Sequence, residues 1–170
     1  MIEEISRKYL EIKSINYLKE VQKPSKNFSL SFTKLNDFQL NKFFYKQIGK
    51  KYHWIDRLIW TDQNWINYVS DKNLSTYVLK NGEDLVGYYE LIFDEKRQEA
   101  EIAYLGVLEE YFGKKLGGFL LSDAIKKSFF LGAKRVWVHT CSLDHRNALK
   151  NYLSRGMKVF KSEILKREIA

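Results

Sequence analysis

The feature that most constrains the fold is a strand, a glycine-containing turn, a helix and a second strand between residues 100 and 141. Residues 100–108 read as a strand, and apolar residues recur at helical spacing from Gly113 to Leu131. Gly132 is a typical residue for ending that helix, and residues 135–141 form the second strand. Two strands joined by one helix run parallel with a right-handed crossover, so we predict a βαβ unit here.

The strands before this unit are predicted to be antiparallel. Residues 74–80 and 85–93 read as strands joined by the hairpin turn Asn81-Gly82, and a polar turn at 94–97 leads into the βαβ unit. A sheet that contains both kinds of pairing is mixed, which favours an α+β class and not a doubly wound one.

The remaining segments are less regular. Residues 8–34 are the least periodic and predict a short strand or helix followed by a strand at 28–34. We predict a first helix that is capped by Asn36, has Gln39 at the third position of a capping box and runs to about Gly49. A second helix should follow Thr61 and run to Val69. A third helix should run from Asp144 to Arg155 and end at Gly156, and a strand should follow from Met157 to Glu163. With one proline and no repeat, residues 1–170 are predicted to form a single domain.

Composition excludes several classes of protein. One cysteine permits no internal disulfide, and three scattered histidines give no metal-ligand spacing, so we expect no metal. The longest apolar run is far too short for a membrane span, and the N-terminus does not resemble a signal peptide, so we expect a cytoplasmic protein without a membrane partner. The net charge of +8 suits an anionic partner, but 22 lysines against 7 arginines do not favour nucleic acid.

The turn Tyr111-Phe-Gly-Lys-Lys-Leu-Gly-Gly118 carries the clearest chemistry. Glycines allow close backbone approach, and a helix N-terminus offers free N–H groups to phosphate oxygens. The spacing matches neither a Walker A loop nor a dinucleotide fingerprint, and a tight turn with a basic cap is the alternative interpretation.

In context, the chain resembles the GNAT superfamily of N-acetyltransferases. The family's Gln/Arg-x-x-Gly-x-Gly/Ala marker falls on Phe112, Lys115 and Gly117, and residues 100–107 match its fourth strand. The run 147–157 resembles the family's Ala-x-x-x-Tyr-x-x-x-Gly-Phe ending. The chain also resembles a bacterial subgroup of the family. The fifth strand of that subgroup matches Trp137-Val-His-Thr-Cys141, and its upstream helix pair matches His53-Trp-Ile-Asp-Arg57 with Trp60 and Trp65. The resemblance covers about residues 8–163.

The resemblance implies a GNAT fold: a mixed, mostly antiparallel sheet with helices on both faces, whose parallel fourth and fifth strands splay apart around the pantetheine of acetyl-CoA. The cofactor residues that it implies are Leu105, Gly106, Val107, Phe112, Gly113, Lys114, Lys115, Leu116, Gly117, Gly118, His145, Ala148 and Tyr152. The chain departs from the family pattern at Phe112, at Lys115 in place of the first marker glycine, and at His145 in place of an asparagine.

The resemblance also implies catalytic roles. Tyr152 is expected to protonate the leaving thiolate, and Glu101 to act as base, unless Glu101 is a solvent-facing strand residue that pairs with Arg135 or a lysine. Glu90 is the substitute base. Candidate acceptor-site residues are Trp54, Arg57, Glu90, Tyr104, His139 and Asp144, with a buried aromatic cluster as the alternative role of the tryptophans.

We therefore expect an acyltransferase that moves an acetyl group from acetyl-CoA directly to a primary amine of a small molecule or peptide. The alternative is a non-catalytic CoA-binding or sensing module, which the departures at Phe112 and Lys115 favour. The acceptor and the oligomeric state, including a homodimer, are left open by the sequence.

Overall fold

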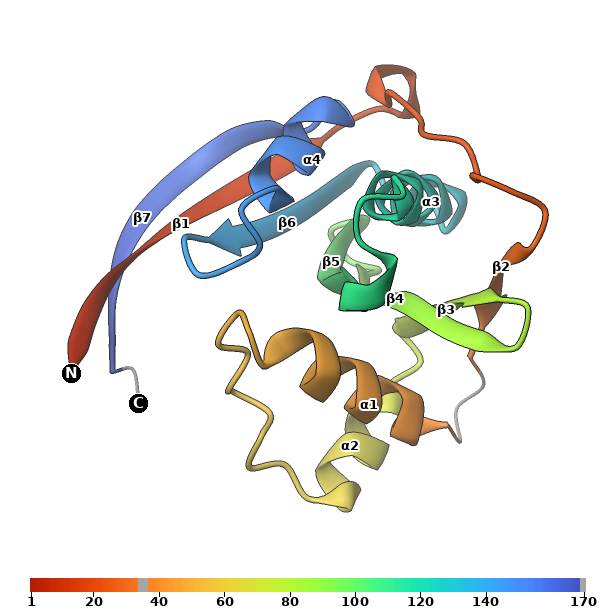
Figure 1. Ribbon diagram of the computed structural model, residues 1–170. Coiled ribbons are helices and arrows are strands. Elements are labelled where there is room, and N and C mark those ends of the chain that lie inside the picture. Colours follow the sequence, from red (N-terminus) through yellow and green to blue (C-terminus); the bar gives the residue numbers. More distant parts are fainter. Residues whose placement is uncertain (34–36, 169–170) are drawn as a thin grey trace.

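The computed structural model describes residues 1–33 and 37–168, and its centre is a seven-stranded sheet in the order β2-β3-β4-β5-β6-β1-β7 (Figure 1). The strands are β1 (Ile2–Ile12), β2 (Phe28–Phe32), β3 (Leu74–Asn81), β4 (Asp84–Asp94), β5 (Glu99–Val107), β6 (Arg135–Cys141) and β7 (Lys158–Glu168). The sheet is mixed, because β5 and β6 pair in parallel and the neighbouring strands pair antiparallel. This confirms the α+β class.

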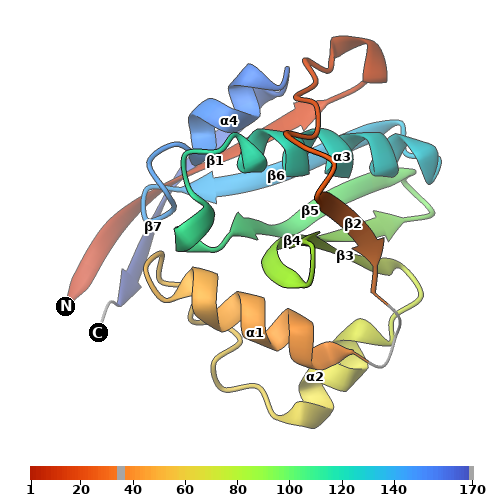
Figure 2. The same ribbon diagram turned by 45° about the vertical axis from the view of Figure 1, so that its right-hand side comes forward.

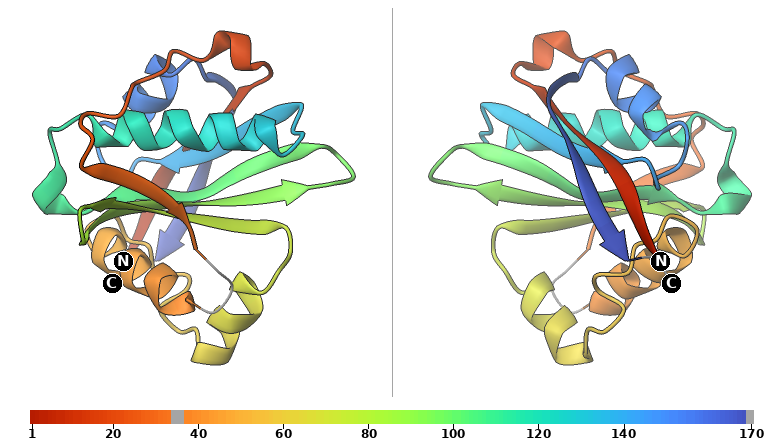
Figure 3. Two further views of the ribbon diagram at one scale, coloured as in Figure 1. Left: turned by 90° about the vertical axis from the view of Figure 1, so that its right-hand side faces the viewer. Right: turned by 90° about the vertical axis from the view of Figure 1, so that its left-hand side faces the viewer.

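Helices cover both faces of the sheet. α3 (Leu116–Phe130) and α4 (Ala148–Ser154) lie on one face, and α1 (Phe38–Gly49) and α2 (Asp62–Val69) lie on the other (Figures 2 and 3). Two short 3-10 helices, η1 (Ile15–Tyr17) and η2 (Glu109–Tyr111), complete the elements. In the part of the chain that the structure describes, no helix is long and apolar enough to cross a membrane.

The core is divided between these two layers. α3 buries Leu120, Leu121 and Ala124 against the sheet, together with Ile102 of β5 and Val136 of β6. On the other face α1 packs Phe44 on Tyr88 of β4, with ring centroids 4.9 Å apart. The sheet is therefore covered on both faces at β4 and at β5, the first strand of the βαβ unit.

The parallel pairing is short, as the GNAT resemblance implies. It extends from Glu99 opposite Arg135 to Glu101 opposite Trp137. Beyond Glu101 the two strands diverge, so the edge of β5 that faces β6 is released from the ladder. In the resemblance described above, β5 and β6 stand where the family has its fourth and fifth strands.

Several predicted boundaries are wrong. The irregular N-terminal stretch contains a full strand from Ile2, because β1 pairs with both β6 and β7, and β7 runs on to Glu168. The helix expected from Gly113 begins at Leu116, and the helix expected from Asp144 begins at Ala148. The hairpin at Asn81, the end of α3 at Gly132 and the cap at Thr61 are confirmed, whereas the predicted cap Asn36 lies outside the described residues.

Candidate active site

A cavity of about 590 Å³ lies where β5 and β6 diverge, between the start of α3, α4 and the α1–α2 loop. One end is lined by the turn before α3 and the other by the α1–α2 loop, including Trp54. Its charged lining comprises Arg7, Lys115, Arg146, Arg167, Asp56 and Asp144. Cationic side chains outnumber carboxylates in this lining, which favours an anionic ligand.

The start of α3 leaves backbone donors free at the first end. The first backbone hydrogen bond of the helix runs from the Phe119 N–H to the Lys115 carbonyl, at 3.2 Å. The N–H groups of residues 116–118 precede that bond and have no carbonyl one turn back to accept them. Together with the positive end of the helix dipole, they form an anion-binding position.

Two residues shape the turn before α3 through their backbone conformation. Gly113 has a φ of +78°, and a Cβ built there would meet no heavy atom within 4 Å, so this part of the turn borders open space. Lys115, the N-cap residue, has a φ of +61° in the left-handed region that favours glycine. The family's glycine at this position thus has a conformational reason, and here a lysine adopts the same conformation.

The middle of the cavity is bordered by residues 102–107 of β5 and by Val138 and His139 of β6. These residues follow the last parallel pair, Glu101 opposite Trp137. Strand edges without a ladder partner offer N–H and C=O groups that can pair with an extended ligand.

Tyr152 reaches the cavity from α4. Its side chain is 8% exposed and lines the cavity with Ala148, one helical turn earlier. Burial, followed by the nearby Asp144 carboxylate, raises the pKa of Tyr152, so the phenol keeps its proton and can donate it. The Asn151 amide donates to the Gly117 carbonyl at 3.1 Å and ties α4 to the start of α3.

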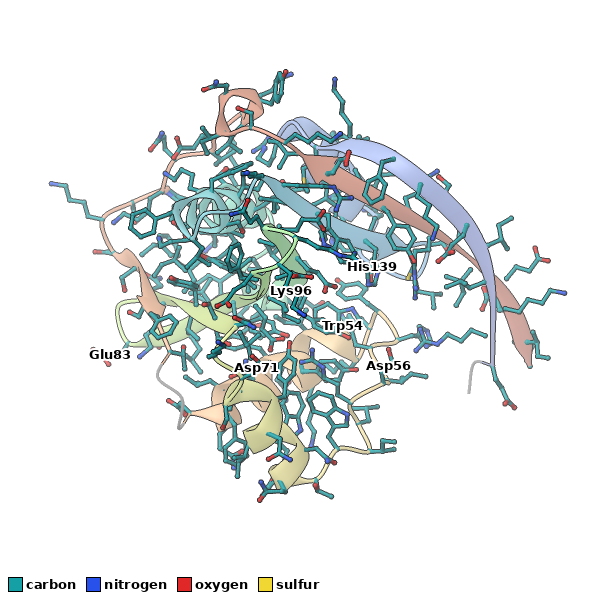
Figure 4. All side chains as sticks on the ribbon, turned by 180° about the vertical axis from the view of Figure 1, so that it is seen from behind. Trp54, Asp56, Asp71, Glu83, Lys96 and His139 are labelled. Carbon is teal, nitrogen blue, oxygen red and sulfur yellow. The ribbon has the colours of Figure 1, made fainter. Side chains whose placement is uncertain are left out.

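Asp144 connects the two sides of the cavity. Its Oδ2 accepts from Thr140 Oγ1 at 2.7 Å and from the Cys141 N–H at 2.9 Å, and its Oδ1 accepts from the Trp54 indole at 3.4 Å. These bonds tie the segment between β6 and α4 to the end of β6 and to the α1–α2 loop. In Figure 4, Trp54 of the α1–α2 loop and His139 of β6 lie on opposite sides of the same gap, with Asp56 further along the loop.

Four of the residues predicted for the site do not line the cavity. The Lys114 ammonium lies 5.3 Å from the centre of the Tyr111 ring. Glu101 is half-buried on β5, burial raises its pKa, and Arg135, its expected partner in the alternative role, pairs instead with Glu11 and Glu99.

Arg57 and Glu90 form a buried ion pair behind the cavity. Their side chains are 8% and 0% exposed, and Arg57 Nη1 lies 3.1 Å from Glu90 Oε1. Glu90 also accepts from the Tyr68 hydroxyl at 2.7 Å and the Asn41 amide at 2.8 Å. Five aromatic rings surround the guanidinium: Tyr45, Trp60, Trp65, Tyr68 and Tyr104. This arrangement corresponds to the buried-cluster alternative for Trp60 and Trp65.

The structure brings the other predicted residues together around the cavity: Leu105, Gly106, Val107, Phe112, Gly113, Lys115, Leu116, Gly117, Gly118, His145, Ala148, Tyr152, Trp54, Tyr104, His139 and Asp144. Sequence reasoning missed Arg7, Tyr52, Asp56, Asn151 and Arg167, which also line it. Asn151 stands one residue before Tyr152 and could have been found from that motif. No pattern in the sequence links Arg7 and Arg167 to the site.

Several solved structures share the fold of this chain. Solved structures with the same fold include a GCN5-related N-acetyltransferase from Sphaerobacter thermophilus (TM-score 0.72, 13% identity, covering 96% of this chain and 51% of that one). A functionally unknown conserved protein from Staphylococcus epidermidis gives a TM-score of 0.65 at 15% identity, with 96% and 61% coverage. An aminoglycoside acetyltransferase from an uncultured soil metagenomic sample, in complex with trehalose, gives 0.65 at 15% identity, with 78% and 90% coverage.

This chain therefore spans about half to three-fifths of the length of the first two of these structures. No curated protein sequence matches it at a significant level. The sequence model of the Acetyltransferase (GNAT) family matches residues 36–157. The chain belongs to the GNAT acetyltransferase family.

Proposed function

We propose that this chain is an acetyl-CoA-dependent N-acetyltransferase that moves an acetyl group directly to a primary amine of a small molecule or peptide. The observation that carries the proposal is one continuous cavity, which joins the free N–H groups at the start of α3 to the diverging strands and to the α1–α2 loop. Acetyl-CoA, when bound, would supply the acetyl thioester.

The residues present fit such a cofactor. The free N–H groups of residues 116–118, the open space beside Gly113 and the lysine at 115 suit a pyrophosphate. The released edge of β5 around Leu105 and Val107 suits the amides of a pantetheine arm. Tyr152 lines the cavity between these positions and the acceptor end, where a protonated phenol can donate to a leaving thiolate.

The test is thiol release from acetyl-CoA with an amine panel of sisomicin, spermidine, tyramine, lysine and tetraglycine. We expect release with at least one amine, and in Tyr152→Phe a roughly 100-fold lower kcat. CoA should still raise the melting temperature of that variant. A full rate in Tyr152→Phe would remove the proton-donor role, and CoA binding without turnover over the panel would favour the non-catalytic module.

A further inference from the structure

We propose that His139 is the base that takes the proton from the acceptor amine in this site. The inference rests on the proposed acetyl transfer and assigns a step for which the family resemblance points to Glu101 or Glu90. It is carried by the position of His139 on β6, by the aromatic contacts of its ring, and by the contacts that occupy the competing carboxylates.

His139 stands at the point where the strands open. It lies two residues beyond Trp137, the last residue of β6 paired with β5, and it lines the cavity. Because side chains alternate along a strand, His139 shares a face with Trp137, while Val138 points into the core under α3. Figure 4 shows His139 of β6 near Trp54 of the α1–α2 loop, which also lines the cavity.

Neighbouring rings fix the imidazole. The Tyr9 ring lies 5.7 Å from it and the Trp137 ring 6.4 Å from it, centroid to centroid. Tyr9 is itself held by a hydrogen bond of 2.5 Å from its hydroxyl to Glu163. A ring packed in this way keeps its orientation without a charged partner, which leaves a nitrogen able to accept a proton.

The charged groups around His139 set its protonation state. Burial, followed by the Arg7 guanidinium of β1, lowers the pKa of His139 from 6.5. Asp144 of the β6–α4 loop, Glu163 of β7 and Asp56 of the α1–α2 loop act in the opposite direction. The imidazole is therefore neutral near pH 7, and these three carboxylates favour the imidazolium once it forms.

The competing carboxylates are engaged or lie elsewhere. Glu90 is 0% exposed, and its oxygens accept bonds from Arg57, Tyr68 and Asn41. Both oxygens of Asp144 accept hydrogen bonds, and the Asp56 carboxylate, which also lines the cavity, is 80% exposed and pairs with Arg167 at 3.8 Å. Glu101 does not line the cavity.

The resulting step balances. The amine nitrogen uses its lone pair to bond to the acetyl carbon, and the carbon–sulfur bond breaks with its electron pair on sulfur. The N–H proton passes to His139 as the new bond makes that nitrogen acidic, and the thiolate takes a proton from Tyr152. His139 then releases its proton to solvent and the Tyr152 phenolate takes one up from solvent, which restores both side chains and leaves no net change in protons.

The experiment compares wild type with His139→Asn, Glu101→Gln and His53→Asn, using the best acceptor of the amine panel. We plot log(kcat/KM) against pH for an amine whose pKa lies above the pH range. Because only the unprotonated amine reacts, the plot rises with a slope of about one. Below the pKa of an essential base, the base must lose a proton as well, and the slope becomes about two. We expect His139→Asn to lose about 100-fold in kcat/KM and to keep a slope of one throughout. The other two variants should retain the change of slope.

A second readout does not depend on turnover. NMR of labelled protein follows the titration of the His139 imidazole, whose signal is identified by its loss in His139→Asn. The midpoint of this titration should lie below pH 6.5. It should also match the pH at which the slope of the wild-type rate profile changes. CoA should raise the melting temperature of wild type and His139→Asn alike. If the wild type turns over and His139→Asn keeps both the wild-type rate and the wild-type change of slope, the assignment is overturned and the acetyl transfer stays intact. The same holds if the NMR midpoint differs from the pH at which the wild-type slope changes. Absence of wild-type turnover over the panel overturns both proposals.

Discussion

Replacing Lys115 by glycine should stabilise the protein, although it removes a side chain. Lys115 has a φ of +61° and a ψ of +17° at the N-cap of α3. A residue with a Cβ loses about 1–2 kcal/mol in the left-handed region. Glycine loses about 0.4–1 kcal/mol more backbone entropy on folding. The difference predicts a gain of about 0.5 kcal/mol for Lys115→Gly, or about 1–2 °C in Tm for a chain of this size.

Two control variants separate the backbone effect from the lysine charge. Lys115→Ala removes the same charge and keeps the Cβ, so it should be about 0.5 kcal/mol less stable than Lys115→Gly. Gly113→Ala makes the opposite change at a φ of +78°, where an added Cβ meets no atom within 4 Å, and should lose about 0.5 kcal/mol.

Urea unfolding of the three variants and wild type measures these differences. If Lys115→Gly is less stable than Lys115→Ala, the conformational argument is refuted, because the two variants differ only in the Cβ. CoA affinity provides a separate result. Both variants lose one exposed cation, so each should bind CoA about fivefold more weakly, equivalent to about 1 kcal/mol.

Two further predictions concern buried charge. Glu90→Ala leaves Arg57 buried without its carboxylate and should lower the free energy of unfolding by about 3–5 kcal/mol, measured in urea; a loss below 1 kcal/mol would show that water reaches the guanidinium. Because burial lowers the pKa of His139, the unfolded chain binds a proton first, and stability should fall as pH drops below 6.5. In His139→Asn the melting temperature should depend less on pH between pH 5 and 7 than it does in the wild type. An equal slope of melting temperature against pH in the two proteins would contradict the lowered pKa of His139.

The sequence predicted well the parts of the fold that local residues determine. The βαβ unit, the hairpin at Asn81 and the helix start at Thr61 all follow from periodicity and turn chemistry within a few residues. β1 and β7 were missed or shortened because their pairing joins opposite ends of the chain, with Ile2 opposite Glu168. Much of β7 is exposed, so it lacks the clean alternation that marks a half-buried strand.

The same distinction applies to the candidate site. The glycines of the α3 turn and Tyr152 were predicted because each belongs to a compact motif. The burial of Glu90 beside Arg57 was not, since it depends on how α1, α2 and β4 pack together. The left-handed conformation of Lys115 also escaped sequence analysis, because lysine rarely adopts it and only the family glycine hints at the requirement.

The cavity itself joins these two kinds of information. Its α3 end comes from one continuous segment, so the chemistry proposed there can be inferred from neighbouring residues in the sequence. Its other end combines Arg7 of β1, Trp54 of the α1–α2 loop, His139 of β6 and Arg167 of β7. Because Trp54 and Asp56 of the α1–α2 loop line the cavity beside His139, we expect substitutions at these two positions to alter the choice of amine more than the affinity for CoA. The acceptor therefore has to be sought by experiment at residues that the fold, and not the sequence order, brings together.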